Sequence, residues 1–397
     1  MLEEAARALN TRGVSQTSFP EIAKAVGVTR AALYYYFDDQ EDLVFQCYRQ
    51  TCELMSQRLR AARALGRDAM GTIDAFVDGV LPEAAAEFAA LSEAAFLRPD
   101  QRAIILAHYT TILGQIAAIL EDGAARGELR PCRARIVAQA IVGVVSWIPL
   151  ARRWRTNESL SHADLVSAIK DLLRHGVAAD RRAPAVYTPF DLAPPRMPAV
   201  RVFDAETMAG ARQEALMAAA SWLFNLKGVD ATSLEEIALR VGVTKKVIYH
   251  NVGDKETLVA ECYRRSFRIY EHIAARTLAY EGSRIEAITA STHAYAESSL
   301  REDITPLAPL AGFEALPDGA REEIQVSAAR LMDGYLRLFA EGQAEGVVRP
   351  LNTRAILAIH PAVFEWLPKW FDIFEPEERA VAPRELGALV RIGLAPL

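Results

Sequence analysis

The chain contains one segment twice, as GVSQTSFPEIAKAVGVTRAALYYYFDDQEDLVFQCYR at Gly13–Arg49 and as GVDATSLEEIALRVGVTKKVIYHNVGDKETLVAECYR at Gly228–Arg264. The copies align without a gap, each residue of the second lying 215 positions after its counterpart, and about half of the positions are identical. Agreement of this kind indicates an internal repeat, which decides how the rest of the sequence is interpreted.

A second pair of matching segments lies further along the chain. The segment GELRPCRARIVAQAIVGVVSWIP, which starts at Gly127, aligns with GVVRPLNTRAILAIHPAVFEWLP, which starts at Gly346, at an offset of 219 residues. Because both pairs occur in the same order at nearly equal offsets, we infer that a whole subunit is duplicated rather than a single motif. The expected units are a first head at 1–48, a first bundle at 49–180, a linker at 181–203, a second head at 204–263 and a second bundle at 264–397.

The composition agrees with a multi-domain globular protein. The 397 residues are 51% hydrophobic and 24% charged, enough to bury at least two cores. The formal net charge of −6 argues against a protein that coats nucleic acid non-specifically, so any DNA-reading surface has to be local. Between the copies, RRAPAVYTPFDLAPPRMPAV at 181–200 is rich in proline, which predicts a semi-rigid linker.

Within each copy the apolar residues recur at helical spacing, and no run of alternating β-branched residues suggests a sheet. The predicted fold class is therefore all-α. Glycines mark the expected helix ends. They are Gly66, Gly123 to Gly127, Gly176, Gly228, Gly282 and Gly346.

Each repeat begins with two short helices joined by a Val-Gly-Val turn. The first helix is expected at 18–25 in one copy and 233–240 in the other, and the second helix opens at Thr29 or Thr244. Glycine suits this turn because it adopts positive φ between two helices that cross steeply. The threonines are predicted N-caps, which leaves the first turn of the second helix free to enter a major groove.

The pattern TS-x-x-EIA-x-x-VGVT, followed by a hydrophobic residue, Tyr, an acidic turn and Glu-x-Leu, resembles the N-terminal domain of the TetR family. The resemblance covers about fifty residues of each copy and implies that the second short helix reads DNA. It implies phosphate contacts by Thr17, Thr29, Tyr34 and Tyr36, and in the second copy by Thr232, Thr244, Tyr249 and Asn251. It places Arg30 and Ala31, and in the second copy Lys245 and Lys246, near base edges, with His250 also in the second DNA-binding set.

The two heads depart from the family pattern in different ways. The family usually has an aromatic residue and then a phosphate-binding lysine after the tyrosine. The first copy keeps the aromatic residue as Phe37 but has Gln40 for the lysine, whereas the second keeps Lys255 but has Val252 for the aromatic residue. We therefore hypothesise that the second head supplies more of the electrostatic affinity. A helix-turn-helix can also serve only as a scaffold, with Tyr34 to Phe37 as core packing.

Beyond each head, about 130 residues of amphipathic helix are enough for a bundle that encloses a pocket. The block from Gly127 to Gly176 resembles the C-terminal domain of a TetR branch that responds to acyl-CoA thioesters or related apolar acids. The candidate pocket residues are Phe96, His108 and Trp147 in the first copy and Phe313 and Trp366 in the second. All five have simple core packing as the alternative, and Arg152 and Arg153, candidates for an anionic ligand, have solvent exposure as theirs.

The same branch implies a dimer interface formed by the last two helices of each subunit. Since both subunits lie on one chain, we expect an intramolecular pseudo-dimer in which residues 133–175 pack on residues 352–393. Two recognition helices about 34–36 Å apart reach successive major grooves. The differing heads then predict an imperfectly palindromic operator. Ligand binding is expected to shift the long helices at 39–64 and 254–280 and so alter the spacing of the heads.

Other classes of function find little support in the sequence. No nucleophile motif, glycine-rich phosphate loop or His pair at metal spacing is present, so we expect neither an enzyme nor a cofactor. The four cysteines lack metal-ligand spacing and are expected to be reduced. We find no uninterrupted apolar run of the roughly 18–20 residues that a membrane span needs, and the acidic start does not resemble a secretory signal. A cytoplasmic repressor released from operator DNA by a small effector is expected, with a helical sensor that has lost DNA binding as the alternative.

The start of the chain lies inside the first head. Met1 aligns with Leu216, and the second copy continues upstream through Arg212. We therefore expect a few residues of the first head to be missing, and with them an arm that touches DNA.

Overall fold

The computed structural model describes residues 1–14, 17–83, 87–151, 154–192, 205–229, 231–252, 254–308, 313 and 316–397. For residues 155, 205, 206, 249–252 and 370–372 it describes the backbone alone. Over these ranges the chain forms helices and no strand, which confirms the all-α prediction; a single isolated β-bridge joins Ala178 to Val348.

The first copy consists of three short helices followed by a bundle. The short helices are α1 (Leu2–Arg12), α2 (Phe19–Val26) and α3 (Arg30–Tyr36). The bundle contains α4 (Gln40–Ala64), α5 (Ala69–Val80), η1 (Ala94–Phe96), α6 (Pro99–Ala125), α7 (Ala134–Ala151), η2 (Arg155–Asn157) and α8 (His162–His175).

The second copy repeats this order. Its head contains α9 (Ala205–Lys227), α10 (Leu234–Val241) and α11 (Lys245–Val252). Its bundle contains α12 (Lys255–Leu278), α13 (Arg284–Leu300), α14 (Asp318–Ala344), α15 (Thr353–Ile359), η5 (His360–Val363), η6 (Leu367–Ile373) and α16 (Pro376–Ile392). The first helix of the second head has 23 residues, whereas α1 has 11.

Both long connecting helices start on an aspartate cap. The Asp39 carboxylate accepts the Asp42 N–H at 2.8 Å, and the Asp254 carboxylate accepts the Thr257 N–H at 2.8 Å. An N-cap carboxylate satisfies a free N–H and complements the positive end of the helix dipole. The resulting helices, α4 and α12, run from each head into its bundle, within two residues of the predicted bounds.

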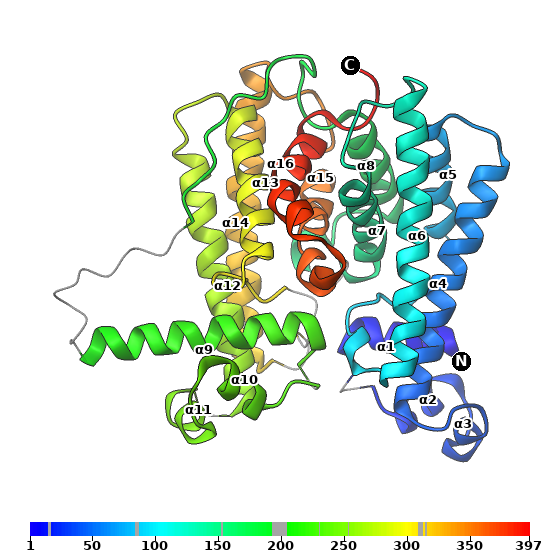
Figure 1. Cartoon of the computed structure of the whole chain (residues 1–397), viewed down its shortest axis with the longest axis vertical. Helices are drawn as coiled ribbons and strands as arrows, with labels where there is room; N and C mark the ends of the chain where they lie inside the picture. Colours follow the sequence, from blue (N-terminus) through cyan, green and yellow to red (C-terminus); the bar gives the residue numbers. More distant parts are fainter. Residues whose placement is uncertain are drawn as a thin grey trace.

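The two bundles pack against each other at the centre of the molecule, and both heads lie at its lower end (Figure 1). The contact is made by α7 and α8 of the first copy with α15, η5 and α16 of the second. The Trp147 indole N–H donates across this interface to the Ala358 carbonyl at 2.8 Å. Gly143 allows a close approach there, since a Cβ would lie 2.8 Å from the Ala362 carbonyl oxygen.

Counterpart residues of the two copies make reciprocal contacts in this interface. Arg130 Nε donates to the Gly393 carbonyl at 2.5 Å, and its counterpart Arg349 donates through Nε to the Gly176 carbonyl at 2.8 Å. Arg130 pairs with Glu385, and Arg349 with Asp171, at N–O distances of 3.3 and 2.6 Å. Such exchange of equivalent contacts is what an isologous, two-fold interface requires.

The part of the linker that the structure describes runs along the second bundle. The Thr188 N–H donates to the Tyr280 hydroxyl at 3.0 Å, and Tyr187 shares a hydrogen bond of 2.9 Å with His293 on α13. Phe190 is buried, and the Arg276 guanidinium lies 5.3 Å from the centre of its ring. Residues 193–203 of the predicted linker lie outside the described residues.

Among the described residues, two helices are long and apolar enough by composition to cross a membrane, contrary to our expectation of none: α6 and α7. In the structure, 89% of the apolar 18-residue stretch of α7 and 44% of that of α6 is buried. Helix α7 lies in the interface between the bundles, so its hydrophobicity is accounted for by packing on both sides.

Candidate functional site

Each head is held by a capped helix pair with a left-handed glycine between the helices. In the second head the Glu236 carboxylate accepts the Ser233 N–H at 3.0 Å while Ser233 Oγ accepts the Glu236 N–H at 3.1 Å, a reciprocal capping box. In both heads the glycine of the turn, Gly27 or Gly242, has φ of 74°. The Val-Gly-Val prediction is thereby confirmed, because only a residue without Cβ adopts this conformation freely.

Helix α3 is anchored on one side and exposed on the other. Leu33 is fully buried and Phe37 is 6% exposed, whereas Tyr34 is 48% and Tyr36 62% exposed. The predicted cap is present, since Thr29 Oγ1 accepts the Ala32 N–H at 3.2 Å. The exposed face therefore displays tyrosines beyond a capped first turn, and only Phe37 of the aromatic run belongs to the core.

The first turn of α3 is ordered by Arg30. Its guanidinium donates to the Tyr34 hydroxyl at 2.9 Å and lies 5.4 Å from the centre of the same ring. Ala31 is exposed beside it. Tyr35, which was not among the predicted contacts, is the most exposed of the three tyrosines at 85%. Its exposure follows from helical spacing, because the buried Leu33 and Phe37 leave the three residues between them on the outer arc.

Helix α11 presents lysines where α3 presents arginine and alanine. Thr244, Lys245 and Lys246 are exposed at its start, and the Val247 N–H donates to the Thr244 carbonyl at 2.9 Å. Lys245 forms an ion pair with Glu235 of α10, which lowers the pKa of that carboxyl through the hydrogen bond. Lys255 opens α12 and is half-buried. The side chains of Tyr249, His250 and Asn251 lie outside the described residues.

Two predicted phosphate ligands need a correction. Thr17 and Thr232 are fully buried, and their hydroxyls donate to the carbonyls of Gly13 and Gly228 at 2.7 and 2.8 Å. A side chain with no exposed surface does not reach a phosphate in this conformation. These threonines instead tie the end of the first helix of each head to the start of the next, because the buried hydroxyls satisfy backbone acceptors.

Gln40 has a role that the sequence interpretation missed. Its amide nitrogen donates to the Val14 carbonyl at 2.6 Å and to the Thr17 carbonyl at 2.9 Å. The residue at the family's lysine position therefore holds the loop of the first head onto α4. The only sequence signal was a replacement of lysine by an uncharged side chain that still has hydrogen-bond donors.

One carboxylate lies between the two heads. Glu93 accepts the Val14 N–H of the first head at 3.0 Å, and a Cβ at Gly228 of the second head would lie 2.8 Å from its other oxygen. The carbonyl of the neighbouring residue, Ser92, accepts a hydrogen bond from the Lys369 ammonium at 3.2 Å. Lys369 belongs to η6 of the second bundle, and burial lowers its pKa to about 8. No motif or spacing in the sequence indicated this contact.

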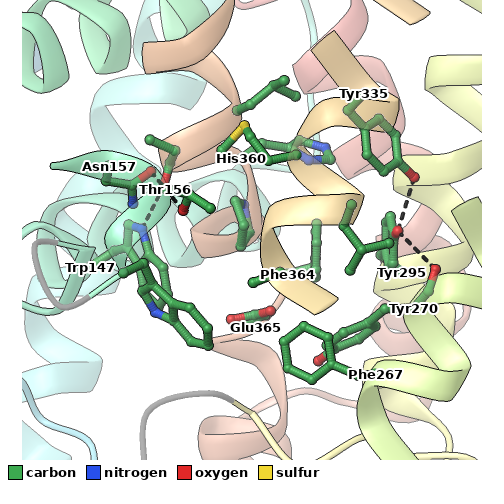
Figure 2. A pocket seen from close by; sticks show the side chains of 17 residues that line it. Trp147, Thr156, Asn157, Phe267, Tyr270, Tyr295, Tyr335, His360, Phe364 and Glu365 are labelled. Atoms are coloured by element: carbon green, nitrogen blue, oxygen red, sulfur yellow. Dashed lines mark hydrogen bonds between the residues drawn. The ribbon is translucent and has the colours of Figure 1, made fainter. Parts of the chain in front are cut away.

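A cavity of about 130 Å³ lies in the second bundle, and the first bundle contributes part of its wall (Figure 2). Its walls come from α7 and the turn after it in the first copy, and from α12, α13, α14, α15 and η5 in the second. Aromatic side chains dominate the lining. They are Trp147, Trp154, Phe267, Tyr270, Tyr295, Tyr335 and Phe364.

Two ionisable side chains, Glu365 and His360, also line this cavity. Glu365 is 5% exposed, and burial raises the pKa of its carboxyl to about 8. Burial lowers the pKa of His360 to about 4, so its imidazole is neutral at pH 7, and its Nε2 lies 3.0 Å from the Thr292 hydroxyl. Both groups are held in their uncharged forms by the surrounding aromatic side chains.

Of the five predicted pocket residues, the structure brings only Trp147 to the cavity wall. Phe313 lies behind the wall, with its ring centre 5.0 Å from that of Trp154. Trp366 is buried at the interface near Gly143, Phe96 lies in η1 and His108 is half-buried on α6. Arg152 and Arg153 lie outside the described residues. The other lining residues were missed because helical spacing does not separate a core aromatic residue from one at a cavity.

The described residues contain no group of three or more His, Cys, Asp or Glu side chains placed to hold a metal ion. All four cysteines are unpaired: Cys47, Cys52 and Cys262 are buried and Cys132 is partly exposed. Burial raises the pKa of the Cys262 thiol to about 12, so it remains protonated.

Comparison with known proteins identifies similar sequences in both copies. Residues 1–47 and 216–262 match the model of bacterial regulatory proteins of the tetR family, and residues 70–181 match that of a tetracyclin repressor-like C-terminal domain. Together these segments cover more than half of the chain. The chain is also 54% identical over 43 residues to the HTH-type transcriptional regulator AcrR of Shigella flexneri. That match covers 11% of this chain and spans about a fifth (20%) of the relative.

Two solved structures illustrate the structural similarity. AibR in complex with isovaleryl coenzyme A and operator DNA is 23% identical, with a TM-score of 0.38, over 43% of this chain and 94% of its own. The TetR family transcriptional regulator PfmR from Thermus thermophilus is 22% identical, with a TM-score of 0.38, over 45% of this chain and 97% of its own.

Proposed function

This chain belongs to the tetR family of bacterial regulatory proteins, and we propose from this premise that it is a ligand-responsive regulator of transcription. In this proposal both heads bind one double-stranded operator in the cytoplasm, and a small molecule in the second bundle controls that binding. The observation that supports it most directly is that each copy retains a buried, capped helix pair whose second helix is exposed on its outer side. A purely structural role does not require exposed tyrosines and lysines on that side.

We propose that α3 and α11 are the reading helices. The proposed contacts of α3 are Thr29, Arg30, Ala31, Tyr34, Tyr35 and Tyr36. Those of α11 and the start of α12 are Thr244, Lys245, Lys246, Tyr249, His250 and Lys255. Both helices lie at the same end of the molecule (Figure 1), which is the arrangement that two successive major grooves require.

The two heads are proposed to contribute differently to binding. The first presents tyrosines and one arginine, and its Gln40 is occupied inside the head. The second presents Lys245, Lys246 and Lys255, so it supplies more phosphate attraction and a steeper salt dependence. An operator with two unlike half-sites follows from this difference.

We propose that one chain is the complete binding unit. The reciprocal contacts of Arg130 and Arg349 are those of a subunit interface, and here both sides belong to the same polypeptide. Covalent connection makes the pairing independent of protein concentration, because the effective local concentration is of roughly millimolar order or higher.

Two connections run from the cavity to the heads and support a mechanism for induction. The first is α12, which begins at the second head with Lys255 and lines the cavity with Phe267 and Tyr270. The second is η6, which follows Glu365 and whose Lys369 contacts Ser92 beside Glu93. A ligand that displaces either element would change the relative position of the heads, and release from the operator, as in a repressor, is the expected result.

The cavity also bears on the chemical class of the effector. The resemblance of the first bundle implied an acyl-CoA thioester or an apolar acid, and the AibR structure contains isovaleryl coenzyme A. In this chain the aromatic lining supports a small effector with a large apolar surface.

DNA binding tests the proposal directly. Fluorescence anisotropy with DNA from upstream of the protein's own gene should give tight binding, weakened about tenfold or more by Arg30→Ala or Lys246→Ala. The control is Arg182→Ala, an arginine beyond the first bundle and away from both heads, which should leave affinity unchanged. If the protein binds no site in a genome-wide map, the chain is instead a helical sensor without DNA-binding activity. If it binds but the head variants bind like the control, Arg30 and Lys246 do not contact the operator and the assignment of the reading helices is wrong.

The division between the heads has its own readout in the same assay. Replacing Lys245 and Lys255 with alanine should flatten the dependence of log affinity on log salt by about one for each lost phosphate contact. An unchanged slope contradicts a larger electrostatic contribution from the second head.

A further inference from the structure

We propose that the cavity of the second bundle binds an apolar cation, such as an aryl or alkyl amine or a quaternary ammonium compound, with Glu365 as its counter-charge. The proposal depends on the proposed function only for the consequence of binding, namely the control of DNA affinity.

The cavity walls have the chemistry that cations of this kind require. Trp147 and Trp154 face it from the first copy, and Phe267, Tyr270 and Tyr295 face it from the second. The electron-rich faces of such rings attract a positive charge while the rest of the ring buries apolar surface. An aromatic enclosure is a recurrent means of binding quaternary ammonium groups.

Glu365 is a buried acid without a direct partner for one of its oxygens. It is 5% exposed, and Oε2 has no hydrogen bond of normal geometry to any described residue. Figure 2 shows its carboxyl between Trp147 on one side and Phe267 and Tyr270 on the other. Burying an ionisable group without a partner costs free energy, so a ligand that supplies the missing donor or positive charge is favoured.

One group near Glu365 already supplies positive charge, but it donates its hydrogen bond elsewhere. Lys369 lies one turn along the chain, and its positive charge partly offsets the burial that raises the pKa of Glu365, but its ammonium donates to the Ser92 carbonyl at 3.2 Å. The Tyr270 hydroxyl is near enough to lower this pKa as a donor to the carboxyl, but among the described residues the two groups do not meet at normal hydrogen-bond geometry. His360 is neutral at pH 7, and the Tyr295 hydroxyl accepts the Tyr335 hydroxyl at 2.9 Å.

The first copy lacks these features at the matching positions. At the offset of 219 residues that relates the two C-terminal blocks, Glu365 corresponds to Ser146 and Phe364 to Val145. His360 corresponds to Ile141, which is fully buried, as is Val145. Positions occupied by small or aliphatic buried side chains in the first copy thus carry an imidazole, a phenyl ring and a carboxyl in the second. The second copy therefore holds the cation site, and the first copy, which lacks a site of its own at the matching positions, contributes Trp147 and Trp154 to its wall.

Three probes of related shape test the charge preference. They are benzyltrimethylammonium, its neutral isostere neopentylbenzene, and the anion phenylacetate. Binding to the full-length protein is measured by tryptophan fluorescence and calorimetry at pH 7. We expect the cation to bind at least about tenfold more tightly than either other probe, because a desolvated cation-π contact together with a carboxylate supplies that difference. Equal affinities, tighter binding of phenylacetate, or no binding of the cation at millimolar concentration overturn the proposal.

Glu365→Gln separates the charge from the shape of the site. It should reduce the affinity for benzyltrimethylammonium at least about tenfold and leave that for neopentylbenzene unchanged. Glu365→Leu should do the same if the isosteric variant fails to fold. Glu377→Gln, which removes an exposed carboxylate on α16, is the matched control and should change neither affinity. If the Glu365 variants retain the cation preference, another group provides the counter-charge and the assignment is wrong.

Proton release gives an independent readout. With its pKa raised to about 8, Glu365 is mostly protonated at pH 7 in the free protein, and a bound cation favours its ionised form. Calorimetry of the cation in two buffers of different ionisation enthalpy should therefore show release of up to about one proton per ligand, absent in Glu365→Gln. Uptake of protons, or equal release in the variant, contradicts the role of Glu365.

The same titrations distinguish this inference from the proposed function. If the cation binds but DNA affinity is unchanged, the cation site is confirmed and its role in controlling DNA binding is contradicted. If DNA is bound and the cation is not, the proposed function stands and this inference fails.

Discussion

Single side chains decide how much of each reading face is available to DNA. In the first head, Arg30 is held against Tyr34, so the arginine is already directed along the outer face of α3. In the second head the corresponding residue, Lys245, is paired with Glu235, an acid on the preceding helix. A carboxylate at this position opposes phosphate binding both by its own charge and by neutralising the lysine.

Removing that acid should therefore strengthen DNA binding. We expect Glu235→Gln to raise operator affinity about threefold or more at about 50 mM salt. The gain should be smaller at higher salt, because salt screens the repulsion between the Glu235 carboxylate and the DNA phosphates that the variant removes. The measurement is fluorescence anisotropy over a salt series, with Glu377→Gln as the control. A double-mutant cycle of Glu235→Gln with Lys245→Ala gives a coupling energy, which measures how much of the effect of Glu235 on DNA affinity acts through Lys245. A loss of affinity in Glu235→Gln would mean that the pair positions Lys245 rather than restraining it.

At the scale of elements, the ends of α8 and α16 hold the two halves together. Both helices stop at a glycine of positive φ, Gly176 at 64° and Gly393 at 61°. A Cβ on Gly176 would lie 2.5 Å from the backbone of Arg391, and one on Gly393 would lie 2.6 Å from the backbone of Arg174. The segments that follow exchange hydrogen bonds across the interface, including Leu394 N–H to the Leu173 carbonyl at 2.8 Å.

Alanine at either position should destabilise the molecule far more than at an ordinary helix end. Gly176→Ala combines the cost of positive φ with a backbone clash, together about 2–5 kcal/mol. Gly127→Ala is the matched control, because its φ is also positive, at 72°, but no described residue apart from its chain neighbours would lie within 4 Å of the added Cβ. The control should lose only about 1 kcal/mol. Urea unfolding followed by circular dichroism checks this, and equal losses in the two variants would contradict a close contact at Gly176.

At the scale of the whole molecule, the duplication replaces two associating chains with one. The interface has its counterpart residues on both sides, and the heads are directed to the same end (Figure 1). A tethered pair also permits the halves to diverge, as they have at the heads and at the cavity. In a homodimer any substitution occurs twice, so one acidic cavity lined in part by the other subunit's tryptophans could not be specified separately.

One chain should therefore occupy one operator. Sedimentation at nanomolar concentration should give the mass of a single 43.7 kDa chain, and the DNA complex should contain one chain per duplex. An operator rebuilt from two identical half-sites should bind more weakly than the natural sequence, whichever half-site is doubled, because one head then meets bases that it does not recognise. Two chains per duplex, or a preference for the symmetric operator, would contradict this arrangement.

The repeat and the heads were predictable because they depend on local sequence. Gly27 and Gly242 indicate a turn whose positive φ only glycine adopts freely, and Thr29 next to Gly27's turn is a typical capping residue. The buried Leu33 and Phe37 lie one helical turn apart. These features act over a few residues, so the sequence displays them directly. Thr17 and Thr232 were misjudged because a hydroxyl that caps a loop internally has the same spacing as one that is exposed.

By itself, the order of amino acids determined that this protein is all-α, that it consists of two related halves, and that each half begins with a helix-turn-helix. Only the tertiary structure decided that the Gln40 side chain bonds inside the first head and that Glu93 lies between the heads. It also decided that Glu365 faces an aromatic cavity lined in part by Trp147 and Trp154 of the other half. The physical reason is distance along the chain. Turns and caps depend on neighbours, whereas a cavity between two halves depends on side chains some 200 residues apart, which become neighbours only when the halves pack.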